Sequence, residues 1–470
     1  MTATSDPRVR VLNDAGIRRG ADYVLYWCQS ARRPRDNLAL ETALAHADAL
    51  SLPCLFYEAI RADYPYASDR FHTFVLEGAK DTARALRARG VAYAFFLPRT
   101  KDEARGVVAK LAERAAIVVT DDAPTFIADH AARAARRVGC RLVAVDDNAV
   151  VPLALFPKQE HAARTIRPKM HKVLDAWLVP LDERAPKKAP RARLDLPFDP
   201  VDVERADVPS LVAACAIDHG VFPVRETRGG AEAAEERLQR FISRRLTAYG
   251  ADKNDPARDA TSQLSPYLHF GMISARRVAL AVREAAADHA GAAEGAATYL
   301  EQLVIRRGLA FNFAARQPKH ASYDAVPDWA KATLKAHERD ARPAILSIDE
   351  LEDARSPDPI WNAAQLELRA RGVIHGYLRM LWAKLVLTWT RTPREAFDAL
   401  VRMNDRYALD GRDPDGYANI AWCFGLHDRP WPERPIFGTV RSMTSRSTAS
   451  KMDLEGYVAR SREHRDLLSR

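Results

Sequence analysis

The sequence has few cysteines and no long hydrophobic run. Its five cysteines are scattered over 470 residues, and no two of them form a CxxC pair. This spacing argues against a disulfide framework and a structural zinc site, and it favours a reducing compartment. No stretch approaches the roughly 18 apolar residues of a membrane-spanning helix, and the first residues lack the apolar core of a signal peptide. We therefore expect a cytoplasmic protein with no membrane segment and no metal site.

The charge balance is only moderately shifted toward the basic side. Lysine and arginine number 71 against 62 aspartates and glutamates, which gives a formal net charge of +9. A positive excess of this size suits a polyanionic partner such as DNA. An arginine-rich surface that binds nothing gives the same number, so charge alone leaves both interpretations open.

A glycine-rich dinucleotide fingerprint (GxGxxG) is also missing, although the N-terminal third alternates apolar β-type runs with helical patterns. Buried strands that alternate with helices predict a doubly wound parallel α/β sheet. The expected strands are Asp22–Gln29, Leu52–Ala59, Val91–Leu97, Ala115–Asp122 and Cys140–Asn148.

Strand patterns nearly vanish in the second half of the chain. Residues 1–185 are predicted to form the α/β domain, and the proline- and charge-rich residues 186–235 an extended interdomain linker. Residues 236–470 are predicted to be all-helical. Six of the eight tryptophans lie there; a large helical domain can use each of them as core filling, but so dense a cluster also suits an aromatic cofactor or base stacking.

The segment "TSQLSPYLHFG", which starts at Thr261, is the first with a chemical signature. Its hydroxyls precede Pro266, a residue suited to the first turn of a helix. The free N–H groups of a helix N-terminus can bind an anion such as a diphosphate. Capping of an ordinary helix explains the same residues, so spacing alone leaves both interpretations open.

Several longer motifs identify a family. "TSQLSPYLHFG" resembles the flavin-phosphate signature of the photolyase/cryptochrome family. The segments "YWCQSARRPRDNLALE", "RFHTFVLEG", "AARTIRPKM", "WNAAQLELRARGVIHGYLRMLWAKLVLTW" and "LDGRDPDGYANIAWCFGLHDRPWPERPIFGTVR" resemble the class II cyclobutane pyrimidine dimer (CPD) photolyases. Because these motifs span most of the chain, the resemblance implies an antenna-type α/β domain followed by a helical FAD-binding domain.

The resemblance implies a U-shaped FAD inside the helical domain. Arg379 corresponds to an arginine that pairs with an aspartate beside the isoalloxazine, and Asp410 is the corresponding carboxylate. Such pairing is physically sensible, since a lone buried guanidinium is costly. Asn404 corresponds to an asparagine at flavin N5, where an amide can both donate and accept. The other implied cofactor contacts are Tyr249, Thr261, Ser262, Gln263, Leu264, Ser265, Arg306, Gly411 and Arg412.

Two tryptophans of the helical motif, Trp382 and Trp389, lie seven residues apart. In a helix they would share one face about 10 Å apart along the axis, a plausible hop for an electron. By resemblance Trp382 lies nearest the flavin, Trp361 relays and Trp389 reaches the surface. Such a series would reduce the flavin on illumination.

The resemblance also implies a flipped-out CPD lesion in UV-damaged double-stranded DNA as the substrate. Excited reduced FAD would donate an electron to the dimer, and the cyclobutane ring would split. A crosslinked dinucleotide stacks poorly, which lowers the cost of extruding it. Trp422 and Trp431 correspond to the walls of the pocket and Met380 to its floor, while Arg429 and Arg441 would hold the duplex through phosphates.

One helix departs from the class II pattern E-E-L-x-x-R-R-E-L. The chain has Gln302 where the lesion-facing glutamate is expected, and Gly308 in place of the later glutamate, while the Arg306–Arg307 pair matches. An amide can donate a hydrogen bond to the lesion but cannot share a proton. Glutamine therefore fits either weaker repair or a protein that has moved toward light sensing.

Two other functions compete with CPD repair. A cryptochrome-like photoreceptor would bind FAD without repairing DNA. Repair of the (6–4) photoproduct is usually associated with histidines over the lesion, and His375 has no obvious partner, so a structural role suits it better. We also expect a monomer that associates with the nucleoid when bound to DNA. The α/β domain could hold a second, antenna chromophore, a deazaflavin or a folate.

Overall fold

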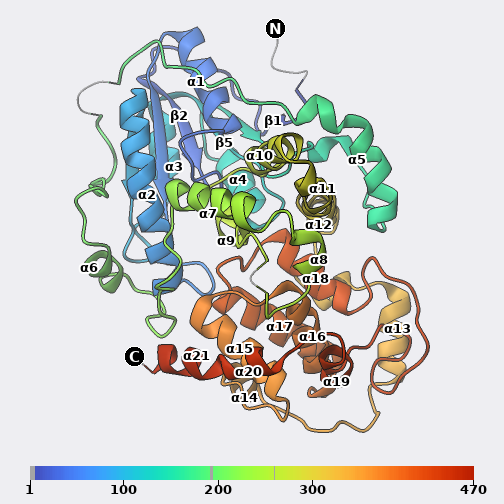
Figure 1. Cartoon of the computed structure of the whole chain (residues 1–470). Helices are drawn as coiled ribbons and strands as arrows, with labels where there is room; N and C mark the ends of the chain where they lie inside the picture. The colour runs from blue at the N-terminus through green and yellow to red at the C-terminus, as the bar shows by residue number, and fades with distance from the viewer. Residues whose placement is uncertain (1–5, 191–193, 259, 470) are drawn as a thin grey trace.

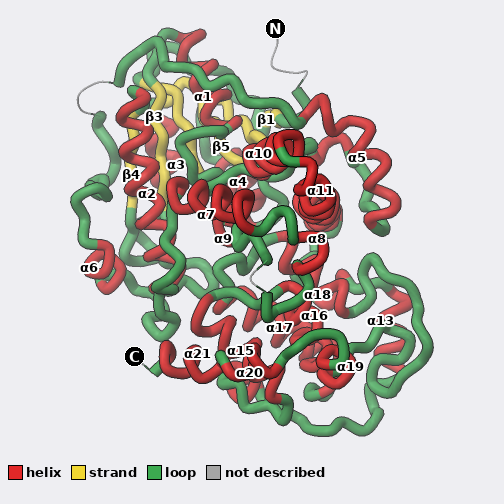
Figure 2. Tube along the Cα trace, in the orientation of Figure 1, coloured by secondary structure: helices red, strands yellow, loops and turns green. Residues whose placement is uncertain are grey.

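The chain forms a sheet-containing part followed by a group of helices (Figure 1). This computed structural model describes residues 6–190, 194–258 and 260–469. The strands lie together in one region, and the helices that follow in sequence occupy the rest of the molecule (Figure 2). The predicted fold class, a doubly wound α/β domain followed by a helical domain, is confirmed.

The sheet of the described residues has six strands in the order β1-β6-β5-β2-β3-β4. All neighbouring pairs are parallel except β1 and β6. The five predicted strands are present, and the antiparallel edge strand β1 was missed because its three residues are largely exposed. The strands are β1 (Val9–Val11), β2 (Tyr23–Cys28), β3 (Cys54–Ala59), β4 (Ala92–Phe96), β5 (Ala115–Asp121) and β6 (Arg141–Val145).

Alternate side chains of β2 enter two different cores. Val24 and Tyr26 pack with α1 on one face of the sheet, whereas Tyr23 and Leu25 pack with α3 on the other. Both faces are therefore covered, which explains the nearly continuous apolar runs of the parallel strands. The helices of this part are α1 (Leu38–Leu50), α2 (Asp69–Arg89), α3 (Val107–Glu113) and α4 (Phe126–Ala135).

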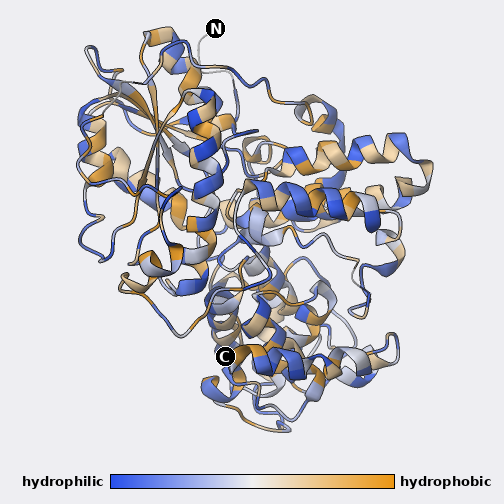
Figure 3. Cartoon of the chain, turned by 60° about the vertical axis from the view of Figure 1, so that its left-hand side comes forward, coloured by the Kyte–Doolittle hydropathy of each residue, from blue (hydrophilic) through white to orange (hydrophobic). Residues whose placement is uncertain are grey.

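Outer helices of the helical part such as α7 and α17 are amphipathic, with apolar and polar residues alternating along the ribbon (Figure 3), whereas α12 and α16 are buried over most of their length. A π-helical turn, η3 (Glu301–Arg306), joins two helices of this part. Its helices are α7 (Ala231–Arg244), α8 (Tyr249–Asp252), α9 (Ser265–His269), α10 (Ala275–Asp288), α11 (Ala293–Leu300), α12 (Arg307–Arg316), α13 (Asp328–Ala336), α14 (Ile348–Glu352), α15 (Pro359–Arg371), α16 (Gly376–Thr388), α17 (Pro393–Tyr407), α18 (Pro414–Cys423), α19 (Ser445–Ala449), α20 (Glu455–Ala459) and α21 (Ser461–Leu468), with short 3-10 turns at Leu153–Leu155, Ala290–Ala292 and Tyr323–Ala325.

The region between the two parts is more packed than the sequence suggested. The prediction of an unpacked linker was wrong, because Phe198 contacts the rings of Tyr57 and Phe96 and the amide of Val201 donates to the Phe95 carbonyl. A short helix, α6 (Val208–Ala213), lies in this region and contacts α2. Apolar residues dispersed among prolines and charges carry too little periodicity to reveal this packing.

The helix α5 (Ala163–Trp177) lies inside the predicted α/β domain but belongs to a core of the helical part. Ile166 and Met170 are buried there with residues of α7, α10 and α12. The domain boundaries at 185 and 235 stay a prediction.

Arg70 on α2 joins the two parts directly. Its side chain, in a residue only 3% exposed, donates to the carbonyl of Phe222 at 3.0 Å and of Leu368 at 3.2 Å, and also to the carbonyls of Arg369 and Tyr407. Three of these carbonyls lie at the C-terminal ends of α15 and α17, where helical carbonyls lack intrahelical partners. One buried guanidinium thus terminates two helices of the other part.

Candidate functional site

The three tryptophans of the predicted relay are in contact. The rings of Trp361 and Trp382 are stacked with an interplanar angle of 8° and centroids 6.4 Å apart. Trp361 meets Trp389 edge-on at 5.3 Å. The indole N–H of Trp361 donates to the Trp382 carbonyl, and that of Trp382 to the Gln365 side chain, at 2.9 and 3.0 Å. Trp361 of α15 therefore lies between Trp382 of α16 and Trp389, which directly follows that helix.

The far end of this series is not where we expected it. Trp389 is only 3% exposed, so the expectation that it reaches the surface is wrong. It sits just after the last turn of α16, and the segment around Leu346 covers it, with the Leu346 amide donating to the Trp389 carbonyl at 2.9 Å. The segment around Leu346 lies more than 40 residues before Trp389 in the sequence. The spacing of the tryptophans therefore could not reveal that this segment buries Trp389.

The predicted arginine–aspartate pair is present. Nη2 of Arg379, on α16, lies 3.1 Å from Oδ1 of Asp410, which follows α17. Arg379 lies three residues before Trp382 on the same helix, so the pair and the tryptophan series share one element.

Asn404 of α17 is buried next to this turn of chain. Its Nδ2 donates to Oδ1 of Asp405 at 3.1 Å, and Asp405 also accepts from the Tyr417 hydroxyl at 2.8 Å and the Arg412 amide at 2.9 Å. Burial raises the pKa of Asp405, which these three donors counteract. A Cβ at Gly411 would lie 2.8 Å from the Asn404 carbonyl oxygen, so this turn has no space for a larger residue.

Arg412 is directed toward the α/β domain. Its guanidinium lies over the ring of Phe126 at 3.7 Å and over that of Tyr64 at 5.0 Å. Its φ of 65° places the backbone in the left-handed region. The Arg412 side chain therefore contacts residues of the α/β domain, whereas its backbone amide donates a hydrogen bond to Asp405.

The segment from Thr261 to Ser265 surrounds the start of α9. Ser262 Oγ accepts from the Tyr299 hydroxyl at 3.1 Å, and Gln263 Oε1 accepts from Arg237 at 2.5 Å. Tyr249 meets the same Tyr299 ring edge-on at 5.2 Å. Leu264 is buried and Ser265 exposed, while the Thr261 carbonyl accepts from Arg245 at 3.0 Å. Because α9 has five residues, it supplies only a small helix dipole for an anion.

Sequence reasoning missed a charged cluster beside this segment. Arg307 Nη1 pairs with Asp415 at 2.9 Å and with Asp413 at 3.4 Å, and Asp413 contacts His269 Nδ1 at 3.2 Å. Burial acts to raise the pKa of Asp413, but Arg307 and His269 lower it to about 2. Arg307 Nε is buried without a partner among the described residues. The only sequence signal was the charge density of "GRDPDGY".

The predicted cofactor residue Arg306 lies apart from this cluster. Its side chain is 52% exposed and pairs with Glu301 at 3.5 Å. The π-helical turn separates the two neighbours, so that Arg306 faces outward and Arg307 inward. Gln302, on the same turn, is exposed.

The space that a glutamate at position 308 would need is occupied. A Cβ at Gly308 would lie 2.2 Å from the Met170 methyl carbon, so α5 packs directly against the helix at this glycine. This explains the departure at position 308, and Gln302 remains the only departure with access to solvent.

The residues expected to contact the lesion gather around the end of α18. The guanidinium of Arg441 lies over the rings of Trp431 and Trp422, at 4.0 and 5.5 Å, and its Nε pairs with Asp428 at 2.9 Å. Arg429 is exposed and lies over Trp431 at 5.3 Å. Met380 of α16 is half-buried, with its carbonyl 4.0 Å from Cys423 Sγ. Five predicted residues are thus brought onto one side of α16 and α18.

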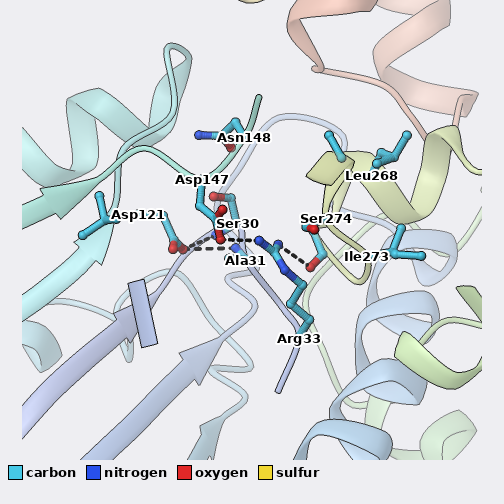
Figure 4. A pocket seen from close by; sticks show the side chains of 12 residues that line it. Ser30, Ala31, Arg33, Asp121, Asp147, Asn148, Leu268, Ile273 and Ser274 are labelled. Atoms are coloured by element: carbon cyan, nitrogen blue, oxygen red, sulfur yellow. Dashed lines mark hydrogen bonds and ion pairs between the residues drawn. The ribbon is translucent and has the colours of Figure 1, made fainter. Parts of the chain in front are cut away.

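A small crevice lies where the sheet meets the α9–α10 turn, at the carboxyl ends of β2 and β5 (Figure 4). Asp121 accepts there from the amides of Gln29 and Ser30, both at 2.7 Å, while Arg33 pairs with Asp147 and donates to the Gly271 carbonyl. Ligands of doubly wound sheets commonly bind at this switch point. Here the protein's own side chains fill it.

His375, the residue weighed for (6–4) chemistry, is half-buried, and neither ring nitrogen has a partner among the described residues. Burial lowers its pKa. Within the described ranges no group of three or more His, Cys, Asp or Glu side chains is arranged to hold a metal ion. None of the described helices combines the length and hydropathy that a membrane span requires.

A two-part chain of this kind, with stacked tryptophans in its helical part, has the architecture of photolyases and cryptochromes. Residues 24–190 match the DNA photolyase family. The chain is 38% identical to the deoxyribodipyrimidine photo-lyase of Methanothermobacter thermautotrophicus, over 97% of this chain and 98% of that protein. It is 36% identical to the enzyme of that name from Oryza sativa, over 96% and 90% of the two chains. A cryptochrome structure from Synechocystis superposes with a TM-score of 0.69 at 15% identity, over 93% of this chain and 88% of that one.

The chain belongs to the DNA photolyase family.

Proposed function

We propose that this protein is a deoxyribodipyrimidine photo-lyase of class II type, which repairs cyclobutane pyrimidine dimers in DNA with light. The observation that carries the proposal is the unbroken contact of Trp382, Trp361 and Trp389, in a chain that matches photo-lyases over nearly its whole length. If these tryptophans only filled the core, the ring of Trp361 would not need to touch the rings of both other tryptophans.

The residues around α16 and α17 fit FAD as the cofactor. Arg379 and Asp410 would hold the isoalloxazine, and Asn404 would face its N5. The hydroxyl of Ser262 and the unpaired Nε of Arg307 are donors suited to the ribityl and phosphate groups. Bound FAD would supply the light-driven electron. The chain's task is to bind and orient it, to exclude water and to pass an electron along the tryptophans.

DNA is the partner that best fits the surface beside the lesion residues. The helix α5 docks on η3 through the Arg167–Glu301 pair at 2.6 Å. Lys158, which precedes α5, and Arg164 and Lys172, which lie on it, are exposed and have no carboxylate partner among the described residues. His427, next to Asp428, contacts the His161 carbonyl at 2.8 Å, so α5 begins beside the lesion residues. Cations without internal partners are free to pair with phosphates.

The glutamine at position 302 also fits a second candidate function, that of a cryptochrome-like photoreceptor. The side chain is exposed and lacks the carboxyl that class II enzymes place there. Repair is favoured because Trp422, Trp431, Arg429 and Arg441, which a sensor would not need, are assembled together. We further expect a cytoplasmic monomer, and an antenna chromophore in the α/β domain would be an addition to this activity.

A repair assay tests the proposal. Protein reconstituted with FAD and reduced under blue light is mixed with a duplex that contains a thymine dimer, and recovery of thymine absorbance is followed with and without light. We expect recovery only in light and its loss in Trp422→Ala. Trp177→Phe, on α5 outside the series, is the control. Photoreduction without recovery would overturn the repair proposal, and Gln302→Glu would then show whether the missing carboxyl is the cause.

A further inference from the structure

A lysine lies in the core beneath the residues expected at the lesion. Lys384, in the middle of α16, is 1% exposed. Its ammonium donates to the Cys423 carbonyl at the end of α18, at 2.5 Å, and no described carboxylate pairs with it. A buried charge without an ion-pair partner costs free energy. Apolar residues of similar length would fill this space at lower cost, so the charge calls for a function.

The ammonium faces the ring of Trp422. Lys384 Nζ lies 5.6 Å from the centroid of this ring, within the range of cation–π attraction. Lys384 is buried and Trp422 is partly exposed, so the ammonium approaches the indole from within the protein. Arg441 also approaches this ring, but Asp428 neutralises its charge at 2.9 Å.

We propose that Lys384 is a positioning residue for lesion binding, which ties α16 to the end of α18 and holds the Trp422 indole in place through its positive charge. The proposal rests on the proposed function, in which Trp422 is a wall of the lesion pocket. Lys384 touches neither lesion nor flavin and acts through Trp422. A lysine at this position also makes lesion affinity depend on pH, which an apolar residue would not do.

The protonation of Lys384 depends on its burial and on three groups around it. Burial lowers its pKa to about 8, since desolvation outweighs the opposing influence of the Cys423 thiol and Asp428, and Arg441 lowers it further. The thiol of Cys423 stays protonated because burial raises its pKa to about 11. The ammonium is therefore present at neutral pH and is lost as the pH rises through about 8.

Two substitutions separate charge from shape. Lys384→Met keeps the unbranched stem without a charge, and Lys384→Arg keeps a charge that does not titrate below pH 12. Lys335→Met removes an exposed lysine of α13, paired with Glu338 at 2.7 Å, and is the control. Affinity for a duplex with a thymine dimer, and for the same duplex undamaged, is measured in the dark from pH 7 to 9.5.

We expect lesion affinity of the wild type and of Lys335→Met to weaken as the pH passes about 8. Lys384→Met should bind the lesion about fivefold to thirtyfold more weakly at pH 7, which corresponds to ~1–2 kcal/mol, with a flat pH profile. Lys384→Arg should restore affinity and also give a flat profile. Wild-type affinity and an unchanged pH profile in Lys384→Met would overturn the proposal.

A second readout does not depend on DNA repair. The fluorescence of Trp422, taken as the difference between the wild type and Trp422→Phe, should titrate near pH 8 and should lose this titration in Lys384→Met. If the wild type does not distinguish damaged from undamaged DNA, the proposed function fails, whereas this titration still supports the contact between Lys384 and Trp422. Absence of the titration overturns the further inference even where repair is intact.

Discussion

Replacement of Arg70 by methionine should loosen the junction between the two parts of the molecule. The guanidinium donates to four backbone carbonyls, at Phe222, Leu368, Arg369 and Tyr407. Methionine would fill much of the volume but would remove this donor from all four carbonyls, of which the Leu368 carbonyl would keep only the Gly372 amide at 2.9 Å. Because three of them end α15 and α17, the last turns of both helices should fray.

The free energy of unfolding that Arg70 contributes is the balance of two opposing terms, the cost of burying its charge and the gain from its hydrogen bonds. Burial lowers the pKa of Arg70 to about 10, a fall that corresponds to a desolvation cost of ~3 kcal/mol. Hydrogen bonds from a charged donor contribute ~1.5–3 kcal/mol each, so four of them exceed this cost. Breaking such a buried network by removing one partner typically costs ~3–5 kcal/mol, and we expect a loss of this size.

Urea unfolding followed by circular dichroism measures the loss, and hydrogen exchange locates it. Arg84→Met on the same helix is the matched control, since that side chain is 56% exposed and pairs with Glu232 at the surface. The control should lose no more than ~1 kcal/mol. If Arg70→Met is no less stable than Arg84→Met, or if exchange at the ends of α15 and α17 is unchanged, the reasoning is refuted.

Three further predictions concern single sites. Trp361→Phe should slow photoreduction of bound flavin by more than an order of magnitude in transient absorption, because it removes the ring that touches both other tryptophans; an unchanged rate would exclude this route. Gly308→Ala should change the free energy of urea unfolding by no more than ~1 kcal/mol, since the new methyl group meets only the flexible end of Met170 and helix propensity offsets the clash, and it should be stabilising when combined with Met170→Ala. Burial lowers the pKa of His72 to about 4. The unfolded state, with a pKa near 6.5, therefore binds more protons, and stability should fall by ~2.5 kcal/mol between pH 7 and 4.5, a loss that His72→Gln should lack.

The parallel strands could be predicted because each is buried on both faces and reads as one apolar run. The edge strand Val9–Val11 could not, since three largely exposed residues carry no such pattern. Packing of Phe198 against β4 was equally hidden, because a single aromatic residue among prolines and charges has no period.

Some features of the candidate site could also be predicted from the sequence, and others could not. The contact between Arg379 and Asp410 could be anticipated, since a buried guanidinium needs a carboxylate and the motifs supplied one. The cluster of His269, Arg307 and Asp413 was missed because its members come from three separate motifs, and no single motif shows that they meet in space. The burial of Trp389 depends on a distant segment, and nothing in the spacing of the tryptophans reports it.

The π-helical turn at Glu301–Arg306 makes this helix sensitive to insertions and deletions. A π turn holds one residue more than an α turn, so a deletion of one residue here would give a regular helix. It would also rotate all that follows by about 100°, the angle between successive residues of an α-helix. Gln302 and Arg306 would then no longer face outward while Arg307 faces inward. Substitutions can accumulate in this turn, but its length is fixed, and relatives that keep both faces should align across it without a gap.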